Sequence, residues 1–167
     1  DLPRVDAAIA QGEVKANPAM TAFIGKLKAS GGTCHLMGLM SPGGVHSHQD
    51  HIAALARILD EAGIPVAIHG FLDGRDTPPS SARGFVADFL KEISGLRHTS
   101  IATIGGRYFA MDRDKRWERV ALAYDTLVDG KGEAAVAAAA AIDAAYRRGE
   151  TDEFVKPTAV AGYRGMK

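Results

Sequence analysis

Short apolar runs alternate with segments of helical spacing along most of the chain. Three runs have the length and composition of buried strands, at residues 33–40, 64–73 and 99–106. A further strand is expected at residues 152–160, with Pro157 at a sheet edge or at the end of the strand. Segments with apolar residues three or four apart predict helices at residues 1–13, 16–32, 47–63, 80–95, 114–130 and 132–150.

Some of these helices carry clear signals for their ends. We expect Asn17 to be an N-cap, Pro18 to lie in the first turn, and Gly31 and Gly32 to end that helix. Other helices carry signals for the face that they bury. The stripe expected in residues 47–63 consists of Ile52, Leu55, Ala56 and Leu59, and that in residues 114–130 of Trp117, Val120, Ala121 and Tyr124. The alanine-rich helix is interpreted as a tightly packed scaffold element, with Ile142 and Tyr146 on one face.

The order of these elements predicts the class of fold. Strands that alternate with helices are typical of right-handed crossovers between parallel strands, and both faces of such a sheet are covered. The sequence therefore predicts an α/β fold with three α/β/α layers around a mostly parallel central sheet. Residues 1–167 form a single domain in this interpretation, because no linker or internal repeat interrupts the pattern.

Composition narrows the classes of partner. Lysine plus arginine number 20, as do aspartate plus glutamate, so no overall field attracts nucleic acid or an anionic membrane. The single cysteine, Cys34, excludes an internal disulfide and is typical of a reducing compartment such as the cytoplasm. No apolar run reaches the roughly 18 residues of a membrane span. Because the chain begins at Asp1 and ends at "GYRGMK", we expect it to be part of a longer protein.

Three successive strands end in polar, glycine-containing loops. These loops read "SPGGVHSH", "DGRDTPP" and "GGRYFAMDRDKRW". Ligands of open parallel α/β sheets bind beyond the carboxyl ends of the strands, so the three loops are expected to line one edge and form one site.

The first loop allows two interpretations. Gly43 and Gly44 precede a helix start, where backbone N–H groups and the helix dipole favour an anion. The spacing of His46, His48 and His51 also suggests a metal site, because imidazole suits zinc, and this is the basis of an alternative hypothesis, a self-sufficient metal-dependent hydrolase. The simpler interpretation of His48 and His51 is that they open a helix as surface or capping side chains.

The other two loops supply charged groups. Arginine can grip a carboxylate or phosphate with two parallel hydrogen bonds, which suits Arg75, Arg107 and Arg113 to a dianion. A carboxylate such as Asp76 can accept from substrate hydroxyls or move a proton. Together, these residue types indicate a site for a small, hydroxylated, doubly anionic molecule.

At these three loops the sequence closely resembles the cofactor-independent (2,3-bisphosphoglycerate-independent) phosphoglycerate mutases. The stretches "HLMGLMSPGGVHSHQDH", "HGFLDGRDTPP" and "GGRYFAMDRDKRWERV" occur in that family's order and spacing, and the similarity runs from about residue 2 to residue 157. The family is an isomerase of glycolysis and gluconeogenesis that interconverts 3-phosphoglycerate and 2-phosphoglycerate. It uses a phosphatase-like domain, with two Mn²⁺ ions and a transiently phosphorylated serine, and an inserted substrate-binding domain, which this chain looks like.

The resemblance also implies roles for individual residues. The implied substrate-binding residues are His46, Arg75, Asp76, Arg107 and Arg113. Asp76 is in addition the expected catalytic residue, and Asp73 is expected to brace Arg75. The phosphorylated serine and the manganese ligands have no counterpart here, so the chain is expected to hold no cofactor and to be inactive without the phosphatase-like domain in cis. The family further implies a cytoplasmic monomer that binds neither nucleic acid nor membrane.

Overall fold

The computed structural model describes residues 2–166 and is built around a five-stranded sheet with the strand order β1-β2-β3-β5-β4. The strands are β1 (Cys34–Leu39), β2 (Val66–Leu72), β3 (Thr99–Gly106), β4 (Glu133–Ala135) and β5 (Thr158–Val160). Strands β1, β2 and β3 are mutually parallel, β5 runs antiparallel to β3, and β4 is parallel to β5. The predicted α/β fold with a mostly parallel sheet is therefore confirmed.

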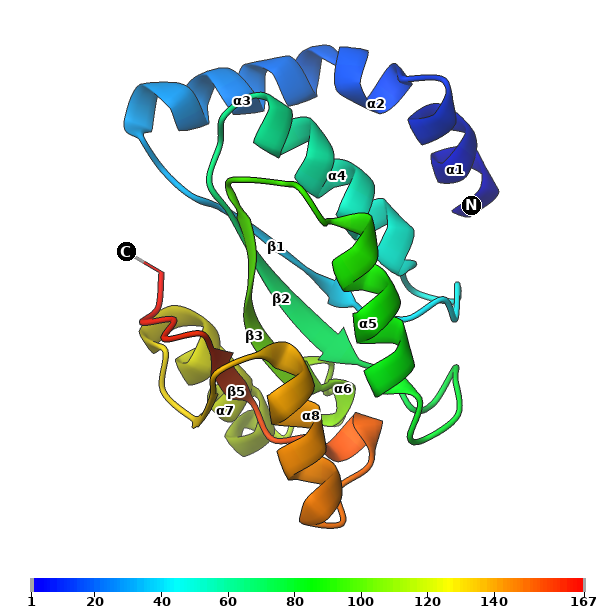
Figure 1. Ribbon diagram of the computed structural model, residues 1–167, viewed down its shortest axis with the longest axis vertical. Helices are drawn as coiled ribbons and strands as arrows, with labels where there is room; N and C mark the ends of the chain where they lie inside the picture. Colours follow the sequence, from blue (N-terminus) through cyan, green and yellow to red (C-terminus); the bar gives the residue numbers. More distant parts are fainter. Residues whose placement is uncertain (1, 167) are drawn as a thin grey trace.

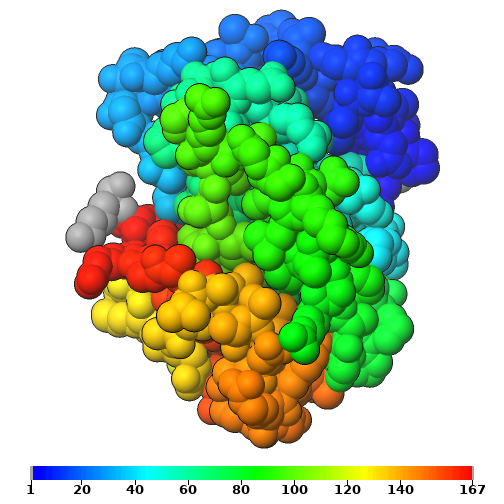
Figure 2. Space-filling view, in the orientation of Figure 1, coloured from blue at the N-terminus to red at the C-terminus, as the bar shows by residue number. Residues whose placement is uncertain are grey.

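Helices flank this sheet. They are α1 (Leu2–Ala10), α2 (Glu13–Ala16), α3 (Pro18–Ser30), α4 (Gln49–Glu61), α5 (Ala82–Glu92), α6 (Arg107–Ala110), α7 (Trp117–Asp129) and α8 (Ala138–Arg147), with a 3₁₀ turn, η1 (Asp152–Phe154). Figure 1 shows α4, α5 and α8 in front of the sheet, α7 behind it, and α1 to α3 in a row beside α4. Side chains of α4, α5 and α8 cover most of the sheet on the front face (Figure 2). No helix in residues 2–166 is long and apolar enough to cross a bilayer.

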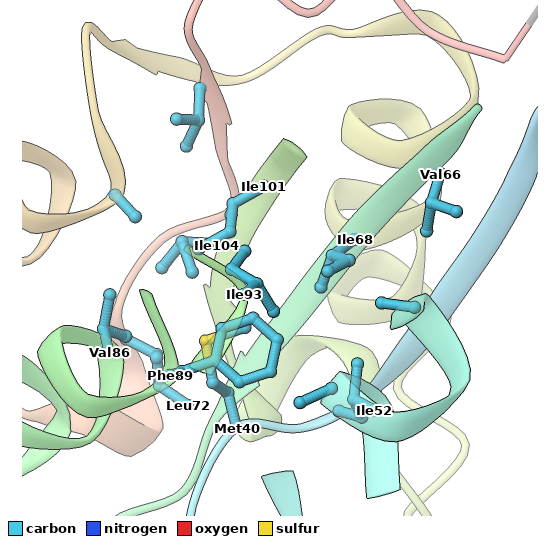
Figure 3. Packing of buried hydrophobic residues seen from close by; sticks show 14 of the residues in the cluster. Met40, Ile52, Val66, Ile68, Leu72, Val86, Phe89, Ile93, Ile101 and Ile104 are labelled. Atoms are coloured by element: carbon cyan, nitrogen blue, oxygen red, sulfur yellow. The ribbon is translucent and has the colours of Figure 1, made fainter. Parts of the chain in front are cut away.

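The hydrophobic core lies between the sheet and the front helices (Figure 3). Phe89 of α5 is fully buried against the sheet residues Ile68, Leu72 and Ile104, and Ile52 of α4 joins the same cluster. Each fully buried side chain of this size contributes roughly 1.5–3 kcal/mol through removal of apolar surface from water. The predicted helix end signals are also confirmed, because the Asn17 side chain accepts a hydrogen bond from the Ala19 amide at 2.8 Å.

One predicted helix face is wrong. In α7, Trp117 is 71% and Tyr124 61% exposed, whereas Ala123 and Thr126 are buried. The buried stripe therefore consists of small side chains, which allow the helix to approach the sheet closely. The sequence showed which positions of the helix share a face. Which of these faces is buried depends on the distance between α7 and the sheet.

The alanine-rich helix begins later than predicted. Residues 133–135 form strand β4, and α8 starts at Ala138. The Glu133 amide donates to the Pro157 carbonyl at 3.1 Å and the Ala161 amide to the Ala135 carbonyl at 2.9 Å, so pairing with β5 overrides the helix propensity of alanine. The last strand is likewise shorter than predicted, since only Thr158–Val160 pair, with Pro157 directly before them.

A buried histidine lies on the other face of the sheet. His69 is fully buried, its Nε2 lies 2.9 Å from Nδ1 of His35, and its Nδ1 lies 2.9 Å from the Thr103 hydroxyl. Burial, with a smaller effect of His35, lowers the pKa of His69 to about 4. His69 is therefore a core residue of the sheet.

This histidine makes stability depend on pH. An unfolded histidine titrates near pH 6.5, so between pH 6.5 and 4 the unfolded chain binds a proton that the folded chain does not. Stability is thus lost as the pH falls through this window, by about 2–3 kcal/mol from His69. Urea unfolding at pH 7.5 and 4.5 will measure the loss, and His69→Gln should remove most of it. An unchanged pH dependence in that variant would contradict this origin.

Candidate functional site

The loops that follow β1, β2 and β3 meet at the carboxyl edge of the sheet and enclose a cavity of about 200 Å³. The cavity is lined by His46, Arg75, Arg107, Tyr108, Met111, Asp112, Arg113, Asp114 and Arg119. Four of the five residues with an expected substrate-binding role thus line a single cavity. The fifth, Asp76, reaches it through its contact with Arg107.

Arg107 is the buried centre of the site. It is only 7% exposed, and its Nη1 donates to Asp73 Oδ1 and to Asp76 Oδ2, each at 2.7 Å. Burial acts to lower the pKa of Arg107, but the two carboxylates outweigh it and raise the pKa above its usual value. Both contacts use Nη1, and among residues 2–166 no side-chain hydrogen bond occupies Nε or Nη2. These donors are available to an anion in the cavity.

Asp73 braces Arg107 rather than the guanidinium of Arg75, which corrects its expected role. It is 2% exposed, and it accepts from the Ser41 hydroxyl at 2.7 Å and from the backbone amides of Arg75 and Asp76. Burial acts to raise the pKa of Asp73, but these donors and Arg107 outweigh it, so the pKa is lowered. Asp73 is therefore a buried carboxylate that connects all three loops, through Ser41 of the first, its own loop and Arg107 of the third.

A close approach of the first loop explains one of its glycines. A Cβ atom at Gly43 would lie 3.1 Å from Asp73 Oδ2 and 3.1 Å from the Asp76 Cβ. The glycine therefore allows the loop after β1 to pack directly against the acidic loop after β2. This role differs from the ligand approach expected from the sequence.

Arg75 has a partner that sequence reasoning missed. Its Nε donates to Glu153 Oε1 at 2.6 Å, and Glu153 comes from η1, 78 residues further along the chain. The hydrogen bond that Arg75 donates to Glu153, together with the charge of this carboxylate, raises the pKa of Arg75 against the opposing effect of burial. No local pattern around Glu153 indicated this contact, because the sequence does not show which loops η1 approaches.

Arg119 was also missed as a cavity residue. Its guanidinium carbon lies 4.0 Å from the centre of the Tyr108 ring, and its Nη1 donates to Asp112 Oδ1 at 3.2 Å. Asp112 in turn accepts from the backbone amide of Arg116 at 2.8 Å. Asp112 thus orders the third loop, and Arg119 forms one wall of the cavity. The sequence pattern assigned no role to Arg119, and only the fold reveals this contact.

Arg113 is the exposed cation of the cavity. Within residues 2–166 no carboxylate lies within ion-pair distance of it. Each of the other three arginines of the cavity has an acidic partner, so among the residues that the structure describes Arg113 is the arginine of the cavity without a carboxylate at ion-pair distance. An anion that enters the cavity meets this cation together with the free donors of Arg107.

The three histidines of the first loop do not converge. His46 lines the cavity, whereas His48 caps α4 by accepting from the Asp50 amide at 3.2 Å. His51 Nε2 pairs with Asp6 Oδ1 at 2.6 Å. Within the described part of the chain, no group of three or more His, Cys, Asp or Glu side chains could hold a metal ion. The simpler interpretation of His48 and His51 therefore holds, and the metal-dependent hydrolase hypothesis has no metal centre to build on here.

The cavity has the chemistry of an anion receptor. Four guanidinium groups face it, and three of them are fixed by carboxylates, which pre-orders their donors before a ligand arrives. Preorganisation of this kind reduces the entropy that binding loses. Asp76, whose Oδ2 lies 2.7 Å from Nη1 of Arg107, is a carboxylate beside these donors with a side chain that is 19% exposed.

Comparison with known proteins agrees with this geometry. The family model "BPG-independent PGAM N-terminus" matches residues 5–167. The chain is 54% identical to the 2,3-bisphosphoglycerate-independent phosphoglycerate mutase of Gluconobacter oxydans and 53% identical to that of Rhodopseudomonas palustris. These alignments cover 100% of this chain but 32% and 33% of the relatives, so the chain spans about a third of their length.

A solved structure shows the same fold. It is that of Leishmania mexicana phosphoglycerate mutase at low cobalt concentration, with a TM-score of 0.83 and 32% sequence identity. The match covers 93% of this chain and 30% of that chain. By sequence and by fold, the chain therefore belongs to the BPG-independent PGAM N-terminus family, which corresponds to one part of the 2,3-bisphosphoglycerate-independent phosphoglycerate mutases.

Proposed function

We propose that this chain is the substrate-binding domain of a phosphoglycerate mutase, an isomerase that interconverts 3-phosphoglycerate and 2-phosphoglycerate. The observation that carries the proposal is the cavity in which Arg75, Arg107 and Arg113 converge with His46. Phosphoglycerate presents a carboxylate and a phosphate on a three-carbon backbone, and arginine donors suit both groups. The relatives that the chain matches over its whole length bear the name of this enzyme.

In this proposal the residues of the cavity divide the work. Arg107 and Arg113 bind the two anionic groups, while Asp76 accepts from the free hydroxyl and takes up or returns its proton as the phosphoryl group changes position. Asp76 is suited to this role because Arg107 Nη1 holds it at 2.7 Å, beside the Arg107 donors that remain free for the anion, and its side chain is 19% exposed. His46 adds a donor from the first loop.

The proposed reaction also needs a group that carries the phosphoryl group between its two positions, and we infer that this group lies outside the 167 residues. We infer that a serine on a phosphatase-like domain of the same polypeptide accepts and returns the phosphoryl group, and that two Mn²⁺ ions on that domain would stabilise the charge of the group as Lewis acids. The side chains described here do not suit such ions, since they offer no metal cluster, so the share of this chain is to bind, orient and hold the substrate. We further propose that the enzyme that contains this chain is a monomer and is located in the cytoplasm.

Titration of 3-phosphoglycerate into the 167-residue chain, followed by NMR with EDTA present, will test the binding function. We expect shifts at the three loops, and an affinity about tenfold lower for Arg113→Ala, because one charge-assisted contact of about 1.5 kcal/mol is lost. Arg113 has no protein partner in residues 2–166, so the variant should fold normally.

Arg116→Ala is the matched control, since Arg116 is exposed in the same loop but does not line the cavity. It should bind like the original chain. Equal affinities for the two variants, or shifts outside the three loops, would overturn the proposed site. Absence of mutase activity in a longer protein that contains this chain would overturn the proposed enzyme.

A further inference from the structure

The turn η1 is wedged between two of the site loops. A Cβ atom at Gly106 would lie 2.0 Å from the Glu153 carbonyl oxygen, and one at Gly74 would lie 2.9 Å from the Glu153 amide nitrogen. Glycine at both positions therefore allows the backbone of η1 to touch the ends of β2 and β3 directly. The Gly106 amide also donates to the Val155 carbonyl at 2.7 Å, which fixes η1 along β3.

The residue before Glu153 anchors the turn from the other side. Asp152 is 1% exposed, and its Oδ2 accepts from the backbone amides of Ser81 and Ala82 at 2.9 Å, at the start of α5. Its Oδ1 accepts from the Tyr146 hydroxyl of α8. Asp152 thus ties η1 to two helices, and the position of Glu153 is set before any ligand is present.

From this anchored position Glu153 holds one edge of the Arg75 guanidinium. Glu153 Oε1 lies 2.6 Å from Nε and 2.5 Å from Nη2 of Arg75. The Glu153 side chain is 13% exposed, whereas that of Arg75 is 47% exposed and lines the cavity. The carboxylate therefore occupies the Nε edge and leaves Nη1 as the free donor of a side chain that has few other contacts.

We propose that Glu153 is a positioning residue for the substrate site, which holds the Arg75 guanidinium at the wall of the cavity so that its free edge meets the anion. The inference rests on the proposed function for the identity of the ligand. Because an unrestrained arginine loses rotamer freedom when it binds, a fixed one binds an anion with a smaller loss of entropy.

The charge of Glu153 acts in the opposite direction. A carboxylate beside Arg75 reduces the positive field of the cavity, so its removal alone would strengthen anion binding. The two effects therefore differ in sign, and a binding measurement separates them. If position dominates, as we propose, loss of Glu153 weakens binding.

The experiment is a double-mutant cycle on the 167-residue chain with 3-phosphoglycerate as the probe. We expect Glu153→Ala and Arg75→Ala each to weaken binding about tenfold, equivalent to one charge-assisted hydrogen bond. The double variant should bind no more weakly than Arg75→Ala alone, because Glu153 acts only through Arg75. Combined with Arg113→Ala, by contrast, the effect of Glu153→Ala should multiply. Glu153→Gln keeps the shape and one acceptor and should retain part of the affinity.

Glu150→Ala is the control for a merely structural effect. Glu150 pairs with Arg148 at 2.7 Å, its side chain is also 13% exposed, and neither residue lines the cavity. It should leave the affinity unchanged. Unchanged or stronger binding in Glu153→Ala, or a multiplicative effect in the Arg75→Ala background, would overturn the positioning role while leaving the proposed function intact. No binding by the original chain would overturn the proposed function itself.

Discussion

Arg107→Ala is expected to cause the largest combined loss of stability and ligand binding. The substitution leaves Asp73, at 2% exposure, as a buried carboxylate without its cationic partner. Removal of one partner of a buried ion pair costs about 3–5 kcal/mol, and we expect the lower value here because the Ser41 hydroxyl and two backbone amides still donate to Asp73. Urea unfolding at pH 7 will measure this loss.

A second substitution tests the origin of that loss. In Arg107→Ala/Asp73→Asn the uncompensated charge is absent, so part of the stability should return while binding of 3-phosphoglycerate stays at least about 100-fold weaker. The control is Arg57→Ala, whose arginine is exposed and pairs with Glu92 on the surface, which should cost less than about 1 kcal/mol. If the double variant were no more stable than Arg107→Ala, the buried charge would not be the cause.

Gly106→Ala is expected to have the second largest effect, for a purely steric reason. The new Cβ would lie 2.0 Å from the Glu153 carbonyl oxygen, 2.4 Å from the Glu153 carbonyl carbon and 2.8 Å from the Asp152 carbonyl oxygen. All three are backbone atoms, so no side-chain rotation relieves the overlap and η1 must move away from β3. We expect a loss of about 3 kcal/mol, at the upper end of overpacking effects, together with weaker ligand binding because Arg75 loses its partner.

Gly25→Ala is the matched control for this variant. Gly25 lies inside α3, and a Cβ there would meet nothing within 4 Å. Alanine should stabilise the helix by about 0.5–1 kcal/mol, because it loses less backbone freedom on folding than glycine does. Thermal unfolding of both variants will show opposite shifts. If Gly106→Ala were as stable as the original chain, η1 would be able to shift away from β3 at little cost. The packing of η1 between the loops would then not fix the position of Glu153.

Much of the framework could be predicted because its causes are local. The cap at Asn17 and the strand at residues 99–106 each depend on a few neighbouring side chains and were found at the expected places. Of the expected stripe in α4, Ile52, Ala56 and Leu59 are buried and Leu55 is half-buried. The parallel order of β1 to β3 follows from the helices between them, since a crossover helix brings the chain back to the same end of the sheet.

The errors fall where distant segments compete with local preference. Residues 133–135 pair with β5 although alanine favours a helix, and α7 buries Ala123 and Thr126 although Trp117 and Tyr124 carry much larger aromatic side chains. In both cases the deciding partner is remote in sequence. Spacing along a helix cannot show how close the sheet lies, and helix propensity is a weak preference that pairing overrides.

The candidate site, too, was predictable where its causes are local and not where they involve distant segments. The sequence by itself determined which residue types stand at the carboxyl ends of the strands, because strands that end in glycine-containing polar loops bring arginine and aspartate to one edge. Only the tertiary structure decided how they are paired: Asp73 with Arg107, Glu153 with Arg75, and Arg119 with Asp112. The physical reason is that a carboxylate selects its partner by distance and burial, and both are set by the packing of segments as far apart as β2 and η1.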